Sequence, residues 1–262
     1  MNSLEYQMLE SLKSLKEEYG VFEIKAEYEN EGSRQTELMR LKDLTEKLNL
    51  PIIIKIGGVE AITDIYMALT LGVKGIIAPM AETAFAASKF LDAIDTFVPE
   101  DNRKDIEFAI NIETITAYHN LDEILKLKKI NLLSSLTIGR VDFGGSLNKD
   151  REFSNSEEMY KYCSEIYNKA KLKNLKTTLG GAVSLDSNEF IKNLIDENLI
   201  EKYETRKLVY KKSSINTFEK GLTEGVNFEL LWLKSKRRYY HRIHNEDEKR
   251  IDMLEKRLNI SK

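Results

Sequence analysis

Short apolar runs alternate along most of the chain with longer segments of helical periodicity. The runs are bounded by glycine or proline, and in residues 52–54 and 75–78 they are apolar at consecutive positions. Consecutive apolar positions are typical of parallel strands, because other layers cover both faces of such a sheet. Strands are predicted within residues 21–29, 51–58, 73–80, 106–113, 132–142, 175–181, 200–206 and 207–212. Helices are predicted within residues 37–48, 61–72, 86–97, 121–128 and 156–171.

The polar residues at the predicted strand ends give the length of one strand–helix unit. Glu29, Lys55, Glu82, Glu113 and Asp142 follow one another at intervals of 26, 27, 31 and 29 residues. Eight units of about 30 residues would occupy about 250 residues, which is the usual size of a (β/α)8 barrel, whereas an open doubly wound sheet usually stops at five or six strands. The sequence therefore predicts a single α/β domain with the fold of a (β/α)8 TIM barrel.

The C-terminal part of the chain carries a different pattern. Residues 213–262 contain no proline and show a helical pattern that is too long for one barrel helix. We therefore assign the barrel to residues 1–212 and a C-terminal helical extension to residues 213–262. Its apolar residues, among them Trp232 and Tyr239, leave a surface that requires a partner. We expect the extension to pack on the barrel or on a neighbouring subunit, and the protein to form a homo-oligomer.

Composition and charge exclude several classes of protein. The chain of 262 residues is 42% hydrophobic and 32% charged, which is sufficient for a sizeable core and excludes intrinsic disorder. Forty basic against 43 acidic residues give a net charge of −3, so we expect no nucleic-acid partner. The single cysteine, Cys163, excludes an intramolecular disulfide and cysteine-rich zinc sites. The N-terminus is charged and no stretch approaches the ~18 apolar residues of a membrane span, so we expect a cytoplasmic protein with no membrane partner.

Two acidic residues stand where the chemistry of a barrel is concentrated. Glu113 closes one apolar run and Asp142 follows the next, and strand ends of this kind converge at one face of a barrel. An unpaired charge is costly at the end of an apolar run. Two carboxylates with open positions suit Mg²⁺ or Mn²⁺, although both residues could instead cap helices or pair with basic side chains. Standard dinucleotide and P-loop phosphate motifs are absent.

Three ordered motifs carry a family resemblance. Residues 51–83 (PIIIKIGGVEAITDIYMALTLGVKGIIAPMAET), 110–125 (INIETITAYHNLDEIL) and 136–147 (LTIGRVDFGGSL) closely resemble the HpcH/HpaI aldolase and citrate lyase β-subunit-like family of the phosphoenolpyruvate/pyruvate barrels. The resemblance covers roughly residues 20–210. It implies that Glu113 and Asp142 are the ligands of a divalent metal, Mg²⁺ or Mn²⁺.

The chain departs from the family pattern at one cationic position. Lys55 stands where the family generally has an arginine, and a point charge can neutralise an enolate but cannot grip a carboxylate with two parallel hydrogen bonds. Arg140 precedes Asp142 by two residues, so we expect it on the same side of the strand, where it would supply the missing guanidinium or form an ion pair. The acidic first-strand motif of the family resembles Glu27-Tyr28-Glu29, and Glu29 is the nearest candidate for a base. A Schiff-base role for Lys55 is a less favoured alternative.

The resemblance implies a function. It indicates a divalent-metal-dependent carbon–carbon lyase or aldolase that acts through a metal-bound enolate of pyruvate or a related 2-oxo acid, with an aldehyde or acyl group as the second reactant. Lys55, Arg140 and Glu29 are then the expected catalytic residues. Those expected to bind substrate are Lys55, Gly57, Gly144 and Gly181, although the glycines could equally form tight turns. The alternatives are a CoA-ester lyase of the citramalyl or malyl type, and a noncatalytic barrel subunit.

Overall fold

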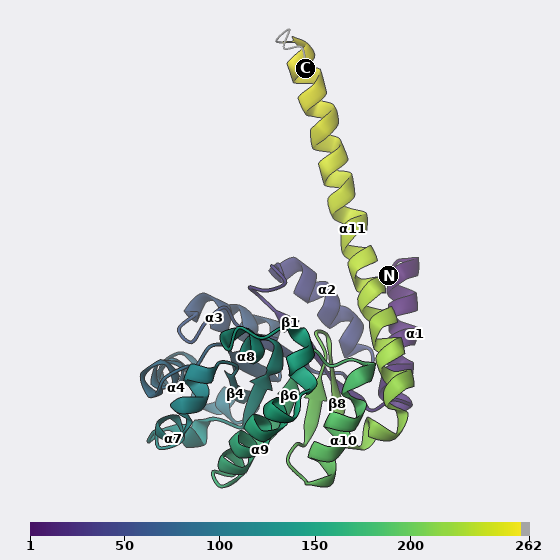
Figure 1. Ribbon diagram of the computed structural model, residues 1–262. Helices are drawn as coiled ribbons and strands as arrows, with labels where there is room; N and C mark the ends of the chain where they lie inside the picture. The colour runs from purple at the N-terminus through teal and green to yellow at the C-terminus, as the bar shows by residue number, and fades with distance from the viewer. Residues whose placement is uncertain (258–262) are drawn as a thin grey trace.

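Eight strands close into a barrel in the computed structural model, which describes residues 1–257 (Figure 1). They follow one another around the barrel in chain order, and each lies inside one of the predicted segments. The strands are β1 (Val21–Glu27), β2 (Ile52–Lys55), β3 (Gly75–Ala78), β4 (Glu107–Ile112), β5 (Ser135–Gly139), β6 (Lys176–Gly180), β7 (Lys202–Glu204) and β8 (Leu208–Lys211). The predicted eight-stranded barrel is therefore confirmed.

The last strand runs in the opposite direction to the others. β1 to β7 are parallel neighbours, whereas β8 is antiparallel to both β7 and β1. Only residues 205–207 separate β7 from β8. A parallel return needs a crossover of about a dozen or more residues, so three residues can only form a hairpin. The final unit is therefore not the βα repeat that the length of the chain predicted.

Helices surround the barrel and fill the intervals between its strands. The predicted helical segments correspond to α2 (Gln35–Glu46), α3 (Ile62–Leu71), α4 (Ala84–Phe97), the short α7 (Leu121–Ile124) and α9 (Glu157–Lys171), and α2 and α4 each begin two residues earlier than predicted. The other helices between strands are α5 (Glu100–Arg103), α6 (Ile115–His119), α8 (Arg140–Ser146) and α10 (Asn188–Asp196). Short 3-10 turns span Ile130–Leu132, Arg151–Asn155, Leu185–Ser187 and Lys212–Thr217. The longer helices are amphipathic; in α2, for example, Leu38 and Leu41 are fully buried.

The inside of the barrel is only partly apolar. Ile53, Ile77, Ala109 and Val209 form a small buried cluster there. A buried ion pair joins Lys202 Nζ to Glu23 Oε2 at 2.9 Å. The same ammonium group lies 3.7 Å from Glu107 Oε2. The large apolar core lies instead between the strands and the surrounding helices.

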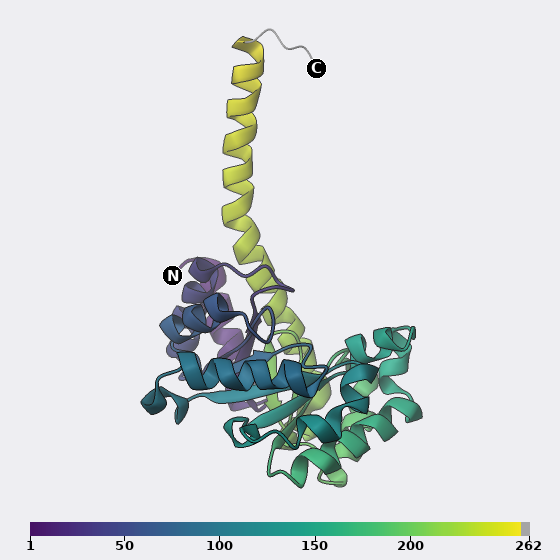
Figure 2. The same ribbon diagram turned by 90° about the vertical axis from the view of Figure 1, so that its left-hand side faces the viewer.

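Two helices that are far apart in sequence pack side by side on the barrel. α1 (Ser3–Glu17) precedes the first strand, and α11 (Phe218–Arg257) follows the last (Figure 1). Phe228 and Trp232 are among the buried residues of α11, but its C-terminal half projects beyond the barrel (Figure 2). Residues 258–262 of the predicted extension lie outside the described residues. Within residues 1–257, no helix combines the length and the hydrophobicity that crossing a membrane would require.

Candidate active site

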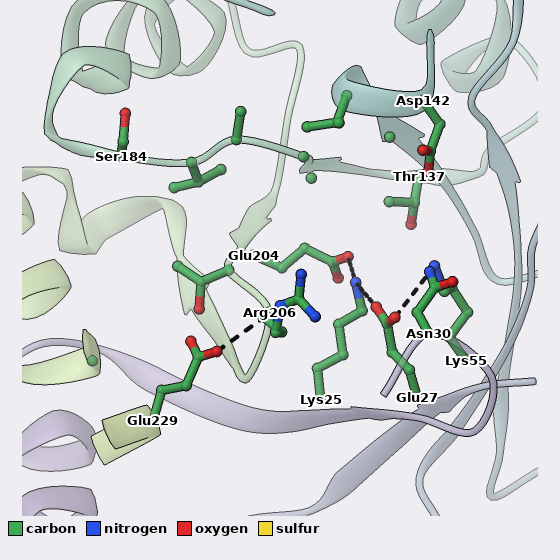
Figure 3. Close-up of a pocket in the computed structure, with 18 of the residues that line it drawn as sticks. Lys25, Glu27, Asn30, Lys55, Thr137, Asp142, Ser184, Glu204, Arg206 and Glu229 are labelled. Carbon is green, nitrogen blue, oxygen red and sulfur yellow. Dashed lines mark hydrogen bonds and ion pairs between the residues drawn. The ribbon is translucent and has the colours of Figure 1, made fainter. Parts of the chain in front are cut away.

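A cavity of about 730 Å³ opens at the C-terminal ends of the parallel strands, where the sequence predicted a site. Its charged cluster consists of Lys25 and Glu27 of β1, Lys55 of β2, Glu113 after β4, Asp142 of α8 and Glu204 of β7. Figure 3 shows Lys25, Glu27 and Glu204 directed toward one another, with Asp142 on another wall. Five segments of the chain thus bring charge into one cavity.

Glu113 is almost fully buried and is held by two hydrogen bonds. The Met80 backbone N–H donates to Oε1 at 3.0 Å, and Asn111 Nδ2 donates to Oε2 at 3.0 Å. Gly139 on the neighbouring strand makes room for this side chain, because a Cβ atom there would lie 2.5 Å from Glu113 Oε2. Burial raises the pKa of Glu113 above its usual value, against the opposing influence of Lys55 and both hydrogen bonds, and Asp142 raises it further.

Asp142 lies in the first turn of α8 and is exposed to the cavity. Among residues 1–257, no basic side chain forms an ion pair with either Asp142 or Glu113. The described part of the chain also holds no group of three or more histidine, cysteine, aspartate or glutamate residues that could bind a metal ion. Glu113 and Asp142 are thus the two carboxylates of the cluster that no basic side chain in the described range binds, and their oxygen atoms are of the type that could hold a divalent cation.

The remaining charges of the cluster form a connected network. Lys25 Nζ lies 2.5 Å from Glu204 Oε1 and 3.3 Å from Glu27 Oε1, and Lys55 Nζ lies 3.5 Å from Glu27 Oε2. Burial disfavours the charge of Lys25, but Glu204 and Glu27 outweigh it and raise the pKa of Lys25. Lys25 is therefore a permanent cation that is bound to two carboxylates.

Two buried acceptor atoms beside this network have no hydrogen-bond donor among residues 1–257. They are Glu204 Oε2 and Asn111 Oδ1, and both residues line the cavity. Leaving a buried acceptor without a donor costs about 1–3 kcal/mol, so such atoms mark a place where a ligand or water completes the site.

Glu29 and Gly57, two of the predicted site residues, do not line the cavity. β1 ends at Glu27, and the chain turns so that Glu29 is exposed beside Gly57. The Gly57 backbone N–H donates to Asp64 Oδ2 at 2.7 Å and is not directed at a substrate. Glu27, two residues earlier, occupies the place that was predicted for Glu29.

Arg140 is fully buried and faces away from the cavity, so the structure contradicts the predicted substrate contact. Its guanidinium group donates to the carbonyl oxygens of Gly180, Gly181 and Ser154 and to Asn155 Oδ1 at 2.8–3.3 Å. The strand ends at Gly139 and a helix begins at Arg140, so the alternation of a strand does not apply. Two positions along a helix differ by about 200° around its axis.

The two remaining predicted glycines have different surroundings. Gly144 is buried against Phe153 in the last turn of α8, outside the cavity, and its carbonyl oxygen accepts bonds from the backbone N–H groups of Leu147 and Lys149. Gly181 does line the cavity. Its φ of +75° lies in the left-handed region, and a Cβ atom there would meet the Arg140 backbone nitrogen at 2.5 Å.

Replacing Arg140 with alanine is expected to destabilise the fold by about 2–4 kcal/mol, because several buried carbonyl groups lose their donor. Urea unfolding followed by circular dichroism would measure the change. Arg151→Ala is a matched control, since Arg151 is exposed at the cavity wall, and it should change stability by less than about 0.5 kcal/mol. An unchanged unfolding midpoint in Arg140→Ala would show that the buried hydrogen bonds of Arg140 do not stabilise the fold.

The mouth of the cavity carries both aliphatic and charged side chains. Val141, Val183, Leu185 and Val226 line it, the last of these from α11. Charged side chains there are Arg151, Arg206 and Glu229, and Arg206 Nε lies 3.9 Å from Glu229 Oε1 (Figure 3). Arg206 therefore pairs with Glu229 at the mouth, whereas Glu204 binds Lys25 deeper in the cavity network.

The chain also matches a known protein family in sequence. The model of the HpcH/HpaI aldolase/citrate lyase family matches residues 45–190, more than half of the chain. The chain belongs to the HpcH/HpaI aldolase/citrate lyase family. The match includes Lys55, Glu113 and Asp142 and ends before β7. None of the curated proteins matches the chain in sequence.

Solved structures share the fold of this family member. An HpcH/HpaI aldolase from Desulfitobacterium hafniense DCB-2 has a TM-score of 0.61 and 13% identity, over 76% of this chain and 82% of that one. The citrate synthase SbnG has a TM-score of 0.60 and 14% identity, over 87% and 89% of the two chains. A citrate lyase beta subunit from M. tuberculosis, complexed with oxaloacetate and magnesium, has a TM-score of 0.51 and 11% identity, over 82% and 92%.

Three charged residues of the cluster were not predicted as site residues, and of these only Glu27 was noted, as part of the first-strand motif. Lys25, Glu27 and Glu204 all lie outside the residues that match the HpcH/HpaI family. A signal for the first two was present, because Glu23, Lys25 and Glu27 alternate with apolar residues and so project from one face of β1. Alternating charges in an otherwise apolar strand indicate a polar barrel interior.

Proposed function

We propose that this protein is a divalent-metal-dependent carbon–carbon lyase or aldolase that acts on pyruvate, or a related 2-oxo acid, and its adducts. The observation that carries this proposal is the pair of unpaired carboxylates, Glu113 and Asp142, in one cavity with two buried lysines. The family of the chain is one of aldolases and lyases, and one structural neighbour is complexed with oxaloacetate and magnesium.

The charge of the cluster fits a divalent cation. Four carboxylates and two lysine side chains leave an excess of two negative charges, and the lysines are directed at Glu27 and Glu204. Glu113 and Asp142 are oxygen donors, which Mg²⁺ and Mn²⁺ prefer. When bound, the ion would act as a Lewis acid that stabilises negative charge on substrate oxygens.

Lys55 would support the same developing charge. Its ammonium group is buried at the cavity and lies 3.5 Å from Glu27 Oε2, so that one carboxylate oxygen orients it while its other donors remain available. A cation in a desolvated cavity stabilises an enolate oxygen more strongly than one in water. As a point charge, Lys55 would not bind a carboxylate through two parallel bonds.

Glu204 is our proposed base in place of Glu29. Lys25 holds its Oε1 atom, while the buried Oε2 atom has no donor among residues 1–257 and belongs to a residue that lines the cavity. The proton of the pyruvate methyl group would move to Oε2, and the electron pair of the C–H bond would remain in the enolate. The enolate carbon then bonds to the aldehyde carbon, and the aldehyde oxygen takes up a proton. Lyase cleavage is the reverse of these steps.

The cavity mouth supports an aldehyde with an apolar group as the second reactant. Val141, Leu185 and Val226 supply aliphatic surface there, and Glu229 offsets Arg206, so Arg151 is the remaining charge. A CoA ester carries several phosphate groups and would need a predominantly basic groove. The mouth therefore favours the aldolase over the citramalyl or malyl type of CoA-ester lyase.

A screen of aldehydes with pyruvate and added Mg²⁺ or Mn²⁺ tests this proposal. We expect aldol products from aliphatic aldehydes, loss of turnover on chelation, and recovery when the metal is restored. Acyl-CoA substrates, screened in parallel with the appropriate 2-oxo acid, are expected to be inactive. Turnover that is unaffected by chelation would contradict the metal-dependent mechanism, and inactivity with every acceptor would favour a noncatalytic barrel subunit.

A further inference from the structure

The long helix α11 has a second apolar stripe that its own barrel does not cover. Phe228, Leu231 and Trp232 are buried against the rest of the chain. On another side of the same helix, Val226, Leu230 and Leu233 are 68%, 47% and 53% exposed. Exposed apolar residues that are aligned along a helix indicate an interaction surface.

The exposed stripe continues into the projecting half of the helix with a regular spacing. Steps of four and three residues alternate from Val226 to Leu254, where Ile251 and Leu254 are 45% and 42% exposed. The nine positions of this stripe are Val226, Leu230, Leu233, Arg237, Tyr240, His244, Asp247, Ile251 and Leu254. Among them, Tyr240 is half-buried and contacts its own barrel, because its hydroxyl donates to Glu37 and its ring lies against the Arg34 guanidinium. A four–three spacing is the heptad repeat of a coiled coil. Figures 1 and 2 show that the C-terminal half of α11 extends past every other element.

Eight of the nine positions, from Leu230 to Leu254, are symmetric about residue 242, and this symmetry specifies the partner of the stripe. We propose that α11 pairs with the α11 helix of a second copy of the chain in an antiparallel coiled coil. Leu230 then lies opposite Leu254 of the second copy, and Leu233 opposite Ile251. The two-fold axis repeats each contact, so the helix pair contains four apolar layers. Ile243, which is 57% exposed beside the stripe, meets its own equivalent near the axis.

Charge selects the antiparallel arrangement. Antiparallel pairing places Arg237 opposite Asp247 of the second copy, twice per dimer, and brings Lys234 near Glu248. A parallel pair in register would instead place Arg237 beside Arg237 and Asp247 beside Asp247. Such like-charge pairs are unfavourable, whereas polar pairs at core positions fix the register and orientation of a coiled coil. The stripe is thus complementary to itself, which favours a second copy over a different protein.

Charge reversal tests the proposed pairing. Multi-angle light scattering of the full chain should give twice the mass of one 30.3 kDa chain. Arg237→Asp and Asp247→Arg should each give monomers, because each places like charges opposite one another, and the double variant should restore the dimer. Arg242→Asp makes the same charge change outside the stripe and should remain dimeric. A monomeric wild type, or a mass that neither single reversal changes, would contradict the proposal.

Cross-linking tests the orientation separately. Leu233→Cys and Ile251→Cys chains, mixed under oxidising conditions, should form a disulfide-linked heterodimer, because these positions are opposed only in the antiparallel pair. The native Cys163 is buried and is not expected to react. Efficient Leu233→Cys homodimers in the absence of the other variant would show a parallel arrangement and overturn the proposal. Circular dichroism of each variant would show that its helix content is retained.

Discussion

Replacing Asp142 with asparagine is expected to weaken Mn²⁺ binding by at least about a hundredfold, because the ion loses one of its two charged ligands. The fold should be unaffected, since Asp142 is exposed and has no ion pair among residues 1–257. Isothermal titration calorimetry would measure the affinity, and thermal unfolding would measure the stability. Asp122→Asn is the control, because Asp122 is an exposed aspartate in the first turn of another helix.

Glu113→Gln should cause the same loss of Mn²⁺ binding. Its fold should also be retained, although Glu113 is buried. The glutamine can still accept the Met80 N–H bond, and its new amide donor can bond to Asn111 Oδ1 if the Asn111 amide turns over. The buried contacts therefore survive while the charge is removed. Wild-type affinity in either Glu113→Gln or Asp142→Asn would show that the residue is not a ligand.

Replacing Glu204 with glutamine is expected to slow proton removal from pyruvate by about 100- to 10,000-fold, the usual contribution of a positioned base. The methyl protons of pyruvate exchange with deuterium when an enolate forms, so loss of the methyl NMR signal in D₂O with Mg²⁺ measures this step. The variant should fold normally, since Lys25 keeps Glu27 as a partner at 3.3 Å.

Glu229→Gln at the cavity mouth is the matched control, and it should exchange at the wild-type rate. Equal exchange in the wild type and in Glu204→Gln would exclude Glu204 as the base while leaving the enolate mechanism intact. Absence of exchange in the wild type, at saturating pyruvate and Mg²⁺, would contradict the proposed function itself. The experiment therefore tests the role of Glu204 as the base separately from the proposed enolate-forming function.

Most of the fold could be predicted from the sequence because its signals are local. Most strands lie within apolar runs bounded by turn residues, and the near-constant spacing of these runs indicated the barrel. The direction of β8 was missed because periodicity carries no information about direction. The short connection was the available signal, since the predicted strands at 200–206 and 207–212 adjoin and leave no room for a crossover.

The site was less predictable because it depends on where each strand ends. Glu113 and Asp142 were found at adjacent strand ends, and the structure places both in one cavity. Glu29 and Arg140 were misplaced because each lies just beyond its strand, where alternation no longer determines the direction of a side chain. Lys25 was missed because it lies within β1 and its partner Glu204 is 179 residues away, a contact that no local pattern encodes.

The antiparallel pairing of β8 with β1 has a consequence for synthesis on the ribosome. The first strand emerges early, but the strand that covers its free edge ends only at Lys211. Until that residue has left the exit tunnel, the nascent chain carries an open sheet edge that can pair with other chains. Chaperone binding during translation is therefore expected to persist until the hairpin of residues 202–211 emerges, and to end when the strand ring closes.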